Sequence, residues 1–458
     1  MTNPKARFCG CLGLCSAFLV AMLFVFPGAP VLQTMIMLLV IAAISAACYR
    51  LMCPPEALGE YTLLAVWTLL GFGLIVNVWY FTTVNGGTIE APVLFNDDAA
   101  TVWRQLRKIS ENHDSFSVYR MHGYASLLYM LSLGTVPRIH ILLGLNAFAI
   151  ILTIIISGAI AQRLCRRGAS VAMLLLACIC YFVASGVILI KDAAVCLVMA
   201  LWLYAVSCKS YNKLDFYLLA LVAIGLGAWI RPHLLPFMAL AVLVIAIDGF
   251  RRRWPAALAM IAAIILIYVC LDGLGIESKV TGSSFDIEGG APSRLAAYRS
   301  VLADYPSLSL WQKLLALPFT LTVQYLTPLP WAFTRDIPFG PSNILAHFSY
   351  PWYAIGGIIL IFFVIGYRKA PKKVYLLAVF GALACAVTAL VTGGTVSRYC
   401  LPWLPAFIPA ASWVISSRIY KTKQFRTLVF VYVLLLVLAL CVVFFSLSKY
   451  SPGGWIAV

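Results

Sequence analysis

Residues 138–162 read RIHILLGLNAFAIILTIIISGAIAQ, and this apolar run determines the class of fold. A helix over the run would be long enough to cross the hydrocarbon core of a bilayer, which is about 30 Å thick. Similar runs recur along all 458 residues, of which 63% are hydrophobic and 11% are charged. They are too long and too evenly apolar for the alternating strands of a membrane barrel. The sequence therefore predicts an all-α polytopic membrane protein.

Apolar runs of about 20 residues predict about thirteen transmembrane helices. Their ranges are 11–27, 31–51, 59–80, 138–162, 168–188, 193–208, 214–230, 234–250, 254–272, 351–367, 374–391, 399–416 and 427–446. Two long polar intervals divide the chain into five parts. These are three N-terminal transmembrane helices (1–81), a first outer loop (82–137), a central transmembrane module (138–272), a second large outer loop (273–350) and the C-terminal transmembrane helices (351–458).

Basic residues gather at every second connection between the predicted helices. With a cytoplasmic N-terminus, the cytoplasmic side holds nineteen basic and four acidic residues, and the outer side holds fourteen and twelve. This follows the positive-inside rule and predicts a multi-pass protein of the cytoplasmic (inner) membrane with both large loops outside. The net charge of +17 then reflects topology and anionic membrane lipids, which argues against nucleic acid as a partner. The orientation requires that 122–136, which is short for a span, forms an interfacial or re-entrant helix.

Asp97 and Asp98 form the only adjacent acidic pair in the chain, in the stretch FNDDAA of the first outer loop. Two carboxylates in water beside a membrane can serve as a general base or as metal ligands. The alternative is that they cap the helix predicted to follow them, since Asp is favoured at that position. Capping and catalysis are compatible, so both interpretations stay open.

Three further charged groups stand where predicted spans reach the outer face. They are Lys191-Asp192, Arg231-Pro232-His233 and Ser397-Arg398-Tyr399. Cations at a membrane boundary can bind phosphate, and the set suits an anionic, lipid-linked substrate. Each group also has a structural alternative. Lys191-Asp192 can form a local ion pair at a helix end. Arg231 and Arg398 can extend to lipid headgroups, and His233 can be a packed histidine.

These elements, taken in order, resemble the integral-membrane glycosyltransferases of the GT-C superfamily. The resemblance covers roughly residues 90–415 and rests on short motifs. They are the acidic pair in the first outer loop, the short apolar helix with His122 and Tyr124, the Lys191-Asp192 start of a span, the sequence Gly225-x-Gly227-Ala228-Trp229-Ile230-Arg231-Pro232, and the sequence Ser397-Arg398-Tyr399-Cys400-Leu401-Pro402-x-x-Pro405.

The resemblance implies a GT-C-like fold and an enzyme that takes a sugar from a polyprenyl-phosphate or polyprenyl-pyrophosphate carrier. The sugar would pass to a lipid, glycan or protein acceptor at the outer (periplasmic or extracellular) face. Asp97 or Asp98 would act as general base or position the acceptor hydroxyl, with Asp97 the preferred candidate. The remaining implied roles are carrier-phosphate binding by Lys191, Arg231 and Arg398, and substrate contacts by Asp192, His233, His122 and Tyr399.

The chain departs from the family pattern in three respects. Three predicted spans precede the acidic loop where the family usually has one, and the motif is Asp-Asp where Asp-Glu is more usual. Asp286 and Glu288 are only candidates for a second outer acidic motif. A divalent metal is therefore left open, because two carboxylates alone make a partial site. No other cofactor is predicted.

Two alternative functions remain at the level of sequence. Polymerases of O-antigen or exopolysaccharide repeat units also have about a dozen spans and a large outer loop, and the aromatic second loop around Trp331 would suit stacking on sugar rings. A transporter or flippase for lipid-linked sugars would line a path with the same charges. Transporters commonly show internal repeats and broken helices, and no repeat is evident in this sequence.

Overall fold

The computed structural model describes residues 4–84, 97–111, 123–132, 138–165, 168–208, 214–246, 262, 308–326, 350–366, 368–392, 397–417 and 421–450. These residues form helices joined by short turns, and no β-strand occurs among them. The predicted all-α class is therefore confirmed for this part of the chain. Apart from residue 262, the predicted span at 254–272 lies outside the described residues, as does most of the second outer loop.

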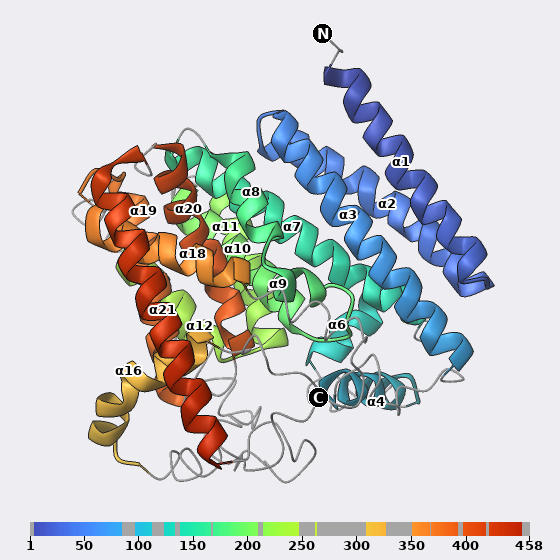
Figure 1. The fold of residues 1–458 in the computed structure, drawn as a ribbon. Coiled ribbons are helices and arrows are strands. Elements are labelled where there is room, and N and C mark those ends of the chain that lie inside the picture. Colours follow the sequence, from blue (N-terminus) through green and yellow to red (C-terminus); the bar gives the residue numbers. More distant parts are fainter. Residues whose placement is uncertain are drawn as a thin grey trace.

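Three long helices begin the chain and pack against one another at one edge of the bundle (Figure 1). They are α1 (Pro4–Val25), α2 (Ala29–Met52) and α3 (Ala57–Trp79). The indole N–H of Trp67 on α3 donates a hydrogen bond of 3.0 Å to the carbonyl of Leu38 on α2. A π-helical turn, η1 (Tyr80–Val84), extends α3 at its end.

Two shorter helices belong to the first predicted outer loop. Helix α4 (Asp97–Glu111) buries Val102, Leu106 and Ile109 along one face and exposes charged residues along the other. Such a helix suits a membrane–water interface. It runs across the end of the bundle where α3 stops (Figure 1) and packs on α6 (Gly123–Leu131). With nine residues, α6 is about 14 Å long, which is shorter than the hydrocarbon core of a bilayer is thick.

The centre of the molecule is α7 (Ile139–Cys165), which packs against α2, α3, α8, α10 and α20. Helices α10 (Asp192–Cys208), α11 (Leu214–Ile230) and α12 (Leu234–Ala246) follow as neighbours. The indole N–H of Trp202 on α10 donates to the carbonyl of Met238 on α12 over 3.1 Å. The short link between α11 and α12 lies at the end of the bundle where α10 begins, because Arg231 Nη1 is 3.9 Å from Asp192 Oδ1.

The C-terminal third forms the opposite edge of the bundle (Figure 1). Its elements are α16 (Leu310–Leu326), α18 (Tyr350–Ile361), the π-helical turn η4 (Phe362–Gly366), α19 (Lys372–Thr392), the 3-10 helix η5 (Ser397–Trp403), α20 (Leu404–Ser416) and α21 (Lys423–Tyr450). The hydroxyls of Tyr325 and Tyr432 both donate to the carbonyl of Tyr353, which ties α16 and α21 to α18.

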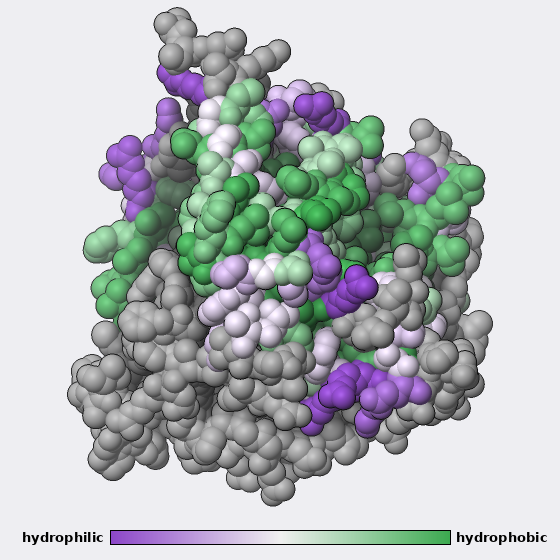
Figure 2. Space-filling view, turned by 90° about the vertical axis from the view of Figure 1, so that its right-hand side faces the viewer, coloured by the Kyte–Doolittle hydropathy of each residue, from purple (hydrophilic) through white to green (hydrophobic). Residues whose placement is uncertain are grey.

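Large apolar side chains are exposed on the outer helices. Leu14, Phe24 and Leu51 of α1 and α2 are 74%, 84% and 84% exposed, and Phe430 of α21 is 70% exposed. Figure 2 shows a hydrophobic band on one side of the molecule with hydrophilic side chains above and below it. A surface of this kind is unfavourable in water and is covered by lipid chains in a bilayer.

Among the residues that the structure describes, five helices are long and apolar enough to cross a membrane by length and composition: Arg7–Val25, Ala29–Met52, Ala57–Thr83, Ile139–Cys165 and Lys372–Leu390. Further apolar helices are shorter, among them Asp192–Cys208, Leu214–Ile230 and Cys400–Ser416. The fold is that of an all-α membrane protein.

The prediction of one continuous helix over 168–188 is wrong. The structure has α8 (Ala169–Ala177), a turn at Cys178–Ile179, the five-residue α9 (Cys180–Ala184) and non-helical chain up to α10. The predicted span 399–416 also begins differently, because Pro402 and Pro405 lie at its start and its first turns form η5. Both differences occur at the end of the bundle where the predicted site residues lie.

Candidate functional site

The segment from Ser185 to Ile190 is largely buried without being helical. Ser185, Val187 and Ile190 are at most 4% exposed. Non-helical backbone inside a membrane protein needs hydrogen-bond partners from neighbouring elements, because lipid offers none. Three polar side chains supply them.

Asn77, Asn146 and Tyr124 hold this segment in place. The Asn77 amide on α3 donates to the carbonyl of Val187 over 2.6 Å. The Asn146 amide on α7 donates to the carbonyls of Ile188 (2.8 Å) and Ile190 (2.9 Å). The Tyr124 hydroxyl on α6 lies within hydrogen-bonding distance of both the Asn146 Oδ1 and the Ile190 carbonyl. Burial raises the pKa of Tyr124 well above its ordinary value, so this hydroxyl keeps its proton and remains a donor.

The segment delivers Asp192 to the first turn of α10, where it faces Arg231 at the end of α11. The Arg231 Nη1 and the Asp192 Oδ1 are 3.9 Å apart, and the two side chains are 20% and 5% exposed. A carboxylate at a helix N-terminus and a cation at a helix C-terminus both interact favourably with the helix dipoles. A guanidinium carries five N–H groups and can contact more than one acceptor.

Lys191 and His233 lie in the same electrostatic neighbourhood. Lys191 is exposed and His233 is partly buried. Burial lowers the pKa of His233, and the nearby charges of Arg231 and Lys191 lower it further. His233 is therefore neutral near pH 7, and it can accept or donate a hydrogen bond without adding positive charge.

Helix α6 packs against this end of α11, and α4 packs on α6. A side chain at Gly123, the first residue of α6, would collide with the carbonyl oxygen of Trp229, two residues before Arg231. The hydrophobic face of α4 packs on α6, and the ring of Trp103 on α4 contacts that of Phe81 at the end of α3, with centroids 5.1 Å apart. The helix that begins at Asp97-Asp98 is thus packed on the helix that contacts the end of α11.

Helix η5 packs against α10. It includes the backbone of Arg398 and Tyr399, whose side chains lie outside the described residues. The Trp403 ring at its end contacts the Phe237 ring of α12 in a tilted arrangement, with centroids 4.6 Å apart, and its N–H donates to the Thr388 hydroxyl on α19. These contacts fix η5 beside α10 and α12.

The predicted site residues therefore fall into two groups. The structure brings together Lys191, Asp192, Arg231 and His233. It places Asp97 and Asp98 in the first turn of α4 and Arg398 and Tyr399 in η5, but their side chains lie outside the described residues, as do His122, Asp286 and Glu288 altogether. Within the described part, no three His, Cys, Asp or Glu side chains gather in an arrangement that could hold a metal ion.

Sequence reasoning missed the three residues that shape the site, Tyr124, Asn77 and Asn146. The two asparagines carried a signal, because an amide within an otherwise apolar run is costly in lipid unless it is hydrogen-bonded. Tyr124 was noted only as part of a short apolar helix.

No protein-family model matches the chain, and no curated protein or solved structure is significantly similar to it.

Proposed function

We propose that the protein is a membrane glycosyltransferase that uses a polyprenyl-phosphate-linked or polyprenyl-pyrophosphate-linked sugar at the end of the bundle where α10 begins. The observation that carries the proposal is the Arg231–Asp192 pair beside Lys191, under α6 and near the helix that begins at Asp97-Asp98. Cations at this boundary suit a carrier phosphate, while the acidic pair supplies a base outside the apolar bundle.

The chemistry requires two functions at one place. The acceptor hydroxyl oxygen forms a bond to the anomeric carbon of the sugar, and the bond from that carbon to the phosphate oxygen breaks. A carboxylate, Asp97 or Asp98, takes the hydroxyl proton. The carrier phosphate leaves with the bonding electrons, and Lys191, Arg231 and Arg398 stabilise its negative charge.

The test is a transfer assay with purified protein in lipid nanodiscs and a panel of polyprenyl-phosphate-linked hexoses and pentoses. Release of the carrier phosphate is followed for wild type, Asp97→Asn and Asp98→Asn. Glu111→Gln, at the far end of α4, is the matched control because it removes the same charge from the same helix. We expect at least one Asp variant to lose about a hundredfold or more in rate, as for a general base, and the control to keep its rate. Full activity of both folded Asp variants would reject the base role.

A second candidate, transport of a lipid-linked sugar, is favoured by one observation, the interrupted helix α8–α9. Discontinuous helices in transporters expose backbone groups to a substrate or ion. Here Asn77, Asn146 and Tyr124 occupy the carbonyls of Val187, Ile188 and Ile190, which argues that the break is structural. Proteoliposomes loaded with a fluorescent polyprenyl-phosphate sugar distinguish the candidates. Movement of intact donor across the bilayer without release of carrier phosphate would favour transport.

A further inference from the structure

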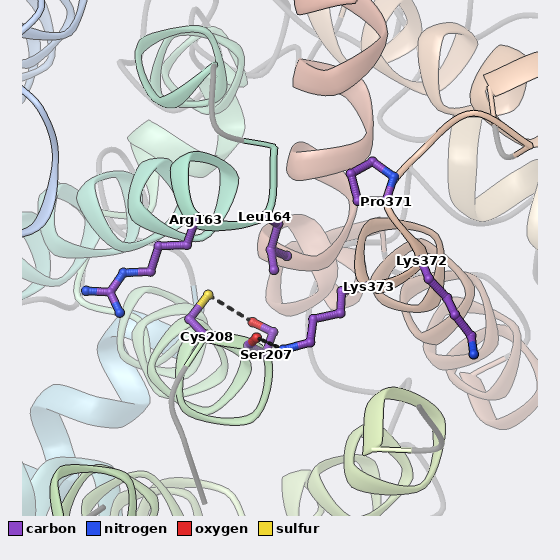
Figure 3. A pocket seen from close by; sticks show the side chains of 7 residues that line it. All are labelled: Arg163, Leu164, Ser207, Cys208, Pro371, Lys372 and Lys373. Atoms are coloured by element: carbon purple, nitrogen blue, oxygen red, sulfur yellow. Dashed lines mark hydrogen bonds between the residues drawn. The ribbon is translucent and has the colours of Figure 1, made fainter. Parts of the chain in front are cut away.

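A pocket lies at the opposite end of α10 from the candidate site. It has a volume of about 290 Å³ and lies between the ends of α7 and α10 and the start of α19 (Figure 3). Its lining residues are Arg163, Leu164, Ser207, Cys208, Pro371, Lys372 and Lys373. The volume is close to the lower end of the range for small-molecule sites, which suits a compact polar group.

The lining of this pocket is cationic. Three of its seven residues are basic, and none is acidic. Arg163 and Lys372 extend on opposite flanks, and Lys373 lies between them (Figure 3). Among the described residues, no carboxylate lies within ion-pair distance of Arg163 or Lys373. An anion that enters would therefore meet positive charge from two separate helices.

Two of these cations are held in place by contacts within the protein. The Lys373 ammonium donates to the carbonyl of Ser207, at the end of α10, over 2.9 Å. Two of its three N–H groups remain for a ligand. The Arg163 guanidinium lies over the Tyr204 ring, 4.9 Å from the centroid. This cation–π contact holds the guanidinium beside the end of α10.

The walls suit a ligand that is partly apolar. Leu164 and Pro371 contribute apolar surface, and the buried Ser207 also lines the pocket. Basic residues at helix ends are expected from the positive-inside rule alone, and that rule requires neither a cavity nor anchored side chains. Basic pockets between transmembrane helices are typical sites for anionic lipid headgroups.

We propose that this pocket binds a phosphate-bearing anion, supplied either by the headgroup of an anionic phospholipid or by free phosphate. Arg163 and Lys373 hold the phosphate oxygens, Lys372 adds charge at the rim, and Leu164 and Pro371 contact the apolar part next to the phosphate. The pocket is separate from the candidate site, because α10, with seventeen residues, is about 25 Å long.

The experiment compares two variants that each remove three positive charges. The pocket variant is Arg163→Gln, Lys372→Gln and Lys373→Gln. The control is Lys421→Gln, Lys423→Gln and Arg426→Gln, three exposed cations at the start of α21 that do not line the pocket. Purified proteins are titrated with phosphatidylglycerol, phosphatidylcholine and inorganic phosphate, and native mass spectrometry and thermal unfolding report binding. Leu164→Trp fills the pocket without changing charge and serves as a second probe if the pocket variant unfolds.

We expect wild type and the control to bind phosphatidylglycerol in preference to phosphatidylcholine, and the pocket variant to bind it about tenfold or more weakly. Leu164→Trp should weaken binding similarly. Stabilisation by phosphatidylglycerol but not by inorganic phosphate identifies a lipid headgroup, whereas equal stabilisation by both identifies free phosphate as sufficient. The proposal would be overturned if wild type showed no preference for phosphatidylglycerol over phosphatidylcholine. Equal loss of phosphatidylglycerol binding in the pocket and control variants would also overturn it.

Discussion

Removal of Arg231 tests whether the charge pair at the start of α10 is a coupled unit. At 3.9 Å, two unit charges interact by about 4 kcal/mol at an effective dielectric constant of about 20. Asp192 is 5% exposed, so removal of Arg231 takes the paired cation away from a buried carboxylate, at a cost of about 3–5 kcal/mol. We therefore expect Arg231→Met, which keeps the aliphatic stem, to lower the free energy of unfolding by about 3 kcal/mol.

The pair is measured by a double-mutant cycle with Arg231→Met, Asp192→Asn and both changes together. Unfolding of each protein in mixed micelles with increasing SDS gives the free energies. Asp192→Asn should cost less, because the partly exposed Arg231 can be solvated, and the double variant should resemble it. The expected coupling is about 2 kcal/mol or more, and Arg104→Met on the exposed face of α4 should change stability by less than about 0.5 kcal/mol. Additive effects, with a coupling under about 0.5 kcal/mol, would refute the coupled pair.

Three further predictions concern the elements around this pair. Asn146→Leu leaves the carbonyls of Ile188 and Ile190 without their amide donor, so it should lower the free energy of unfolding in SDS by about 2–4 kcal/mol, and Tyr124→Phe should lower it by about 1 kcal/mol. Unchanged stability of both variants would contradict the role of these side chains. Gly123→Ala should destabilise the protein by about 1–3 kcal/mol because its methyl group meets the Trp229 carbonyl, while Gly225→Ala, with open space around it, should be neutral or slightly stabilising. Equal changes in stability at the two glycines would reject the close contact between α6 and α11. Because the pKa of His233 is lowered in the folded state, the unfolded chain binds more protons, and stability should fall as pH drops from 7 to 5. His233→Gln should reduce that fall in a thermal-unfolding series, and an unchanged pH dependence in this variant would count against a lowered pKa of His233.

The long apolar helices could be predicted from the sequence because their length is set by the bilayer and their ends are marked by charges. The run 214–230 coincides with α11, and 193–208 agrees with α10 to within one residue. Hydropathy could not reveal the interruption after α8, because residues 168–190 are mostly apolar and carry no charged side chain. The interruption depends on Asn77, which lies 110 positions from the carbonyl it contacts, and a pattern within the segment cannot report such a partner.

The candidate site was predictable to the extent that charge counting places residues at a common end of the bundle. Charge counting placed Lys191, Asp192, Arg231 and His233 at one end, and the structure has them as neighbours there. Their pairing could not be predicted, because it depends on how α10 and α11 pack and on how deeply Asp192 is buried. The roles assigned to Asp97, Asp98 and Arg398 stay predictions.

The interrupted helix explains why charges gather where α10 begins. A single helix over 168–208 would be about 60 Å long, about twice the hydrocarbon thickness, so the chain has to reverse direction. It does so through Ser185–Lys191, inside the bundle, where Asn77 and Asn146 replace the lost helical hydrogen bonds. The first turn of α10 is therefore buried, and Asp192 needs Arg231 beside it. Because α6 supplies Tyr124 to the same segment, any movement of α6 would loosen the reversal and the charge pair together, which couples the covering helices to the candidate phosphate-binding residues.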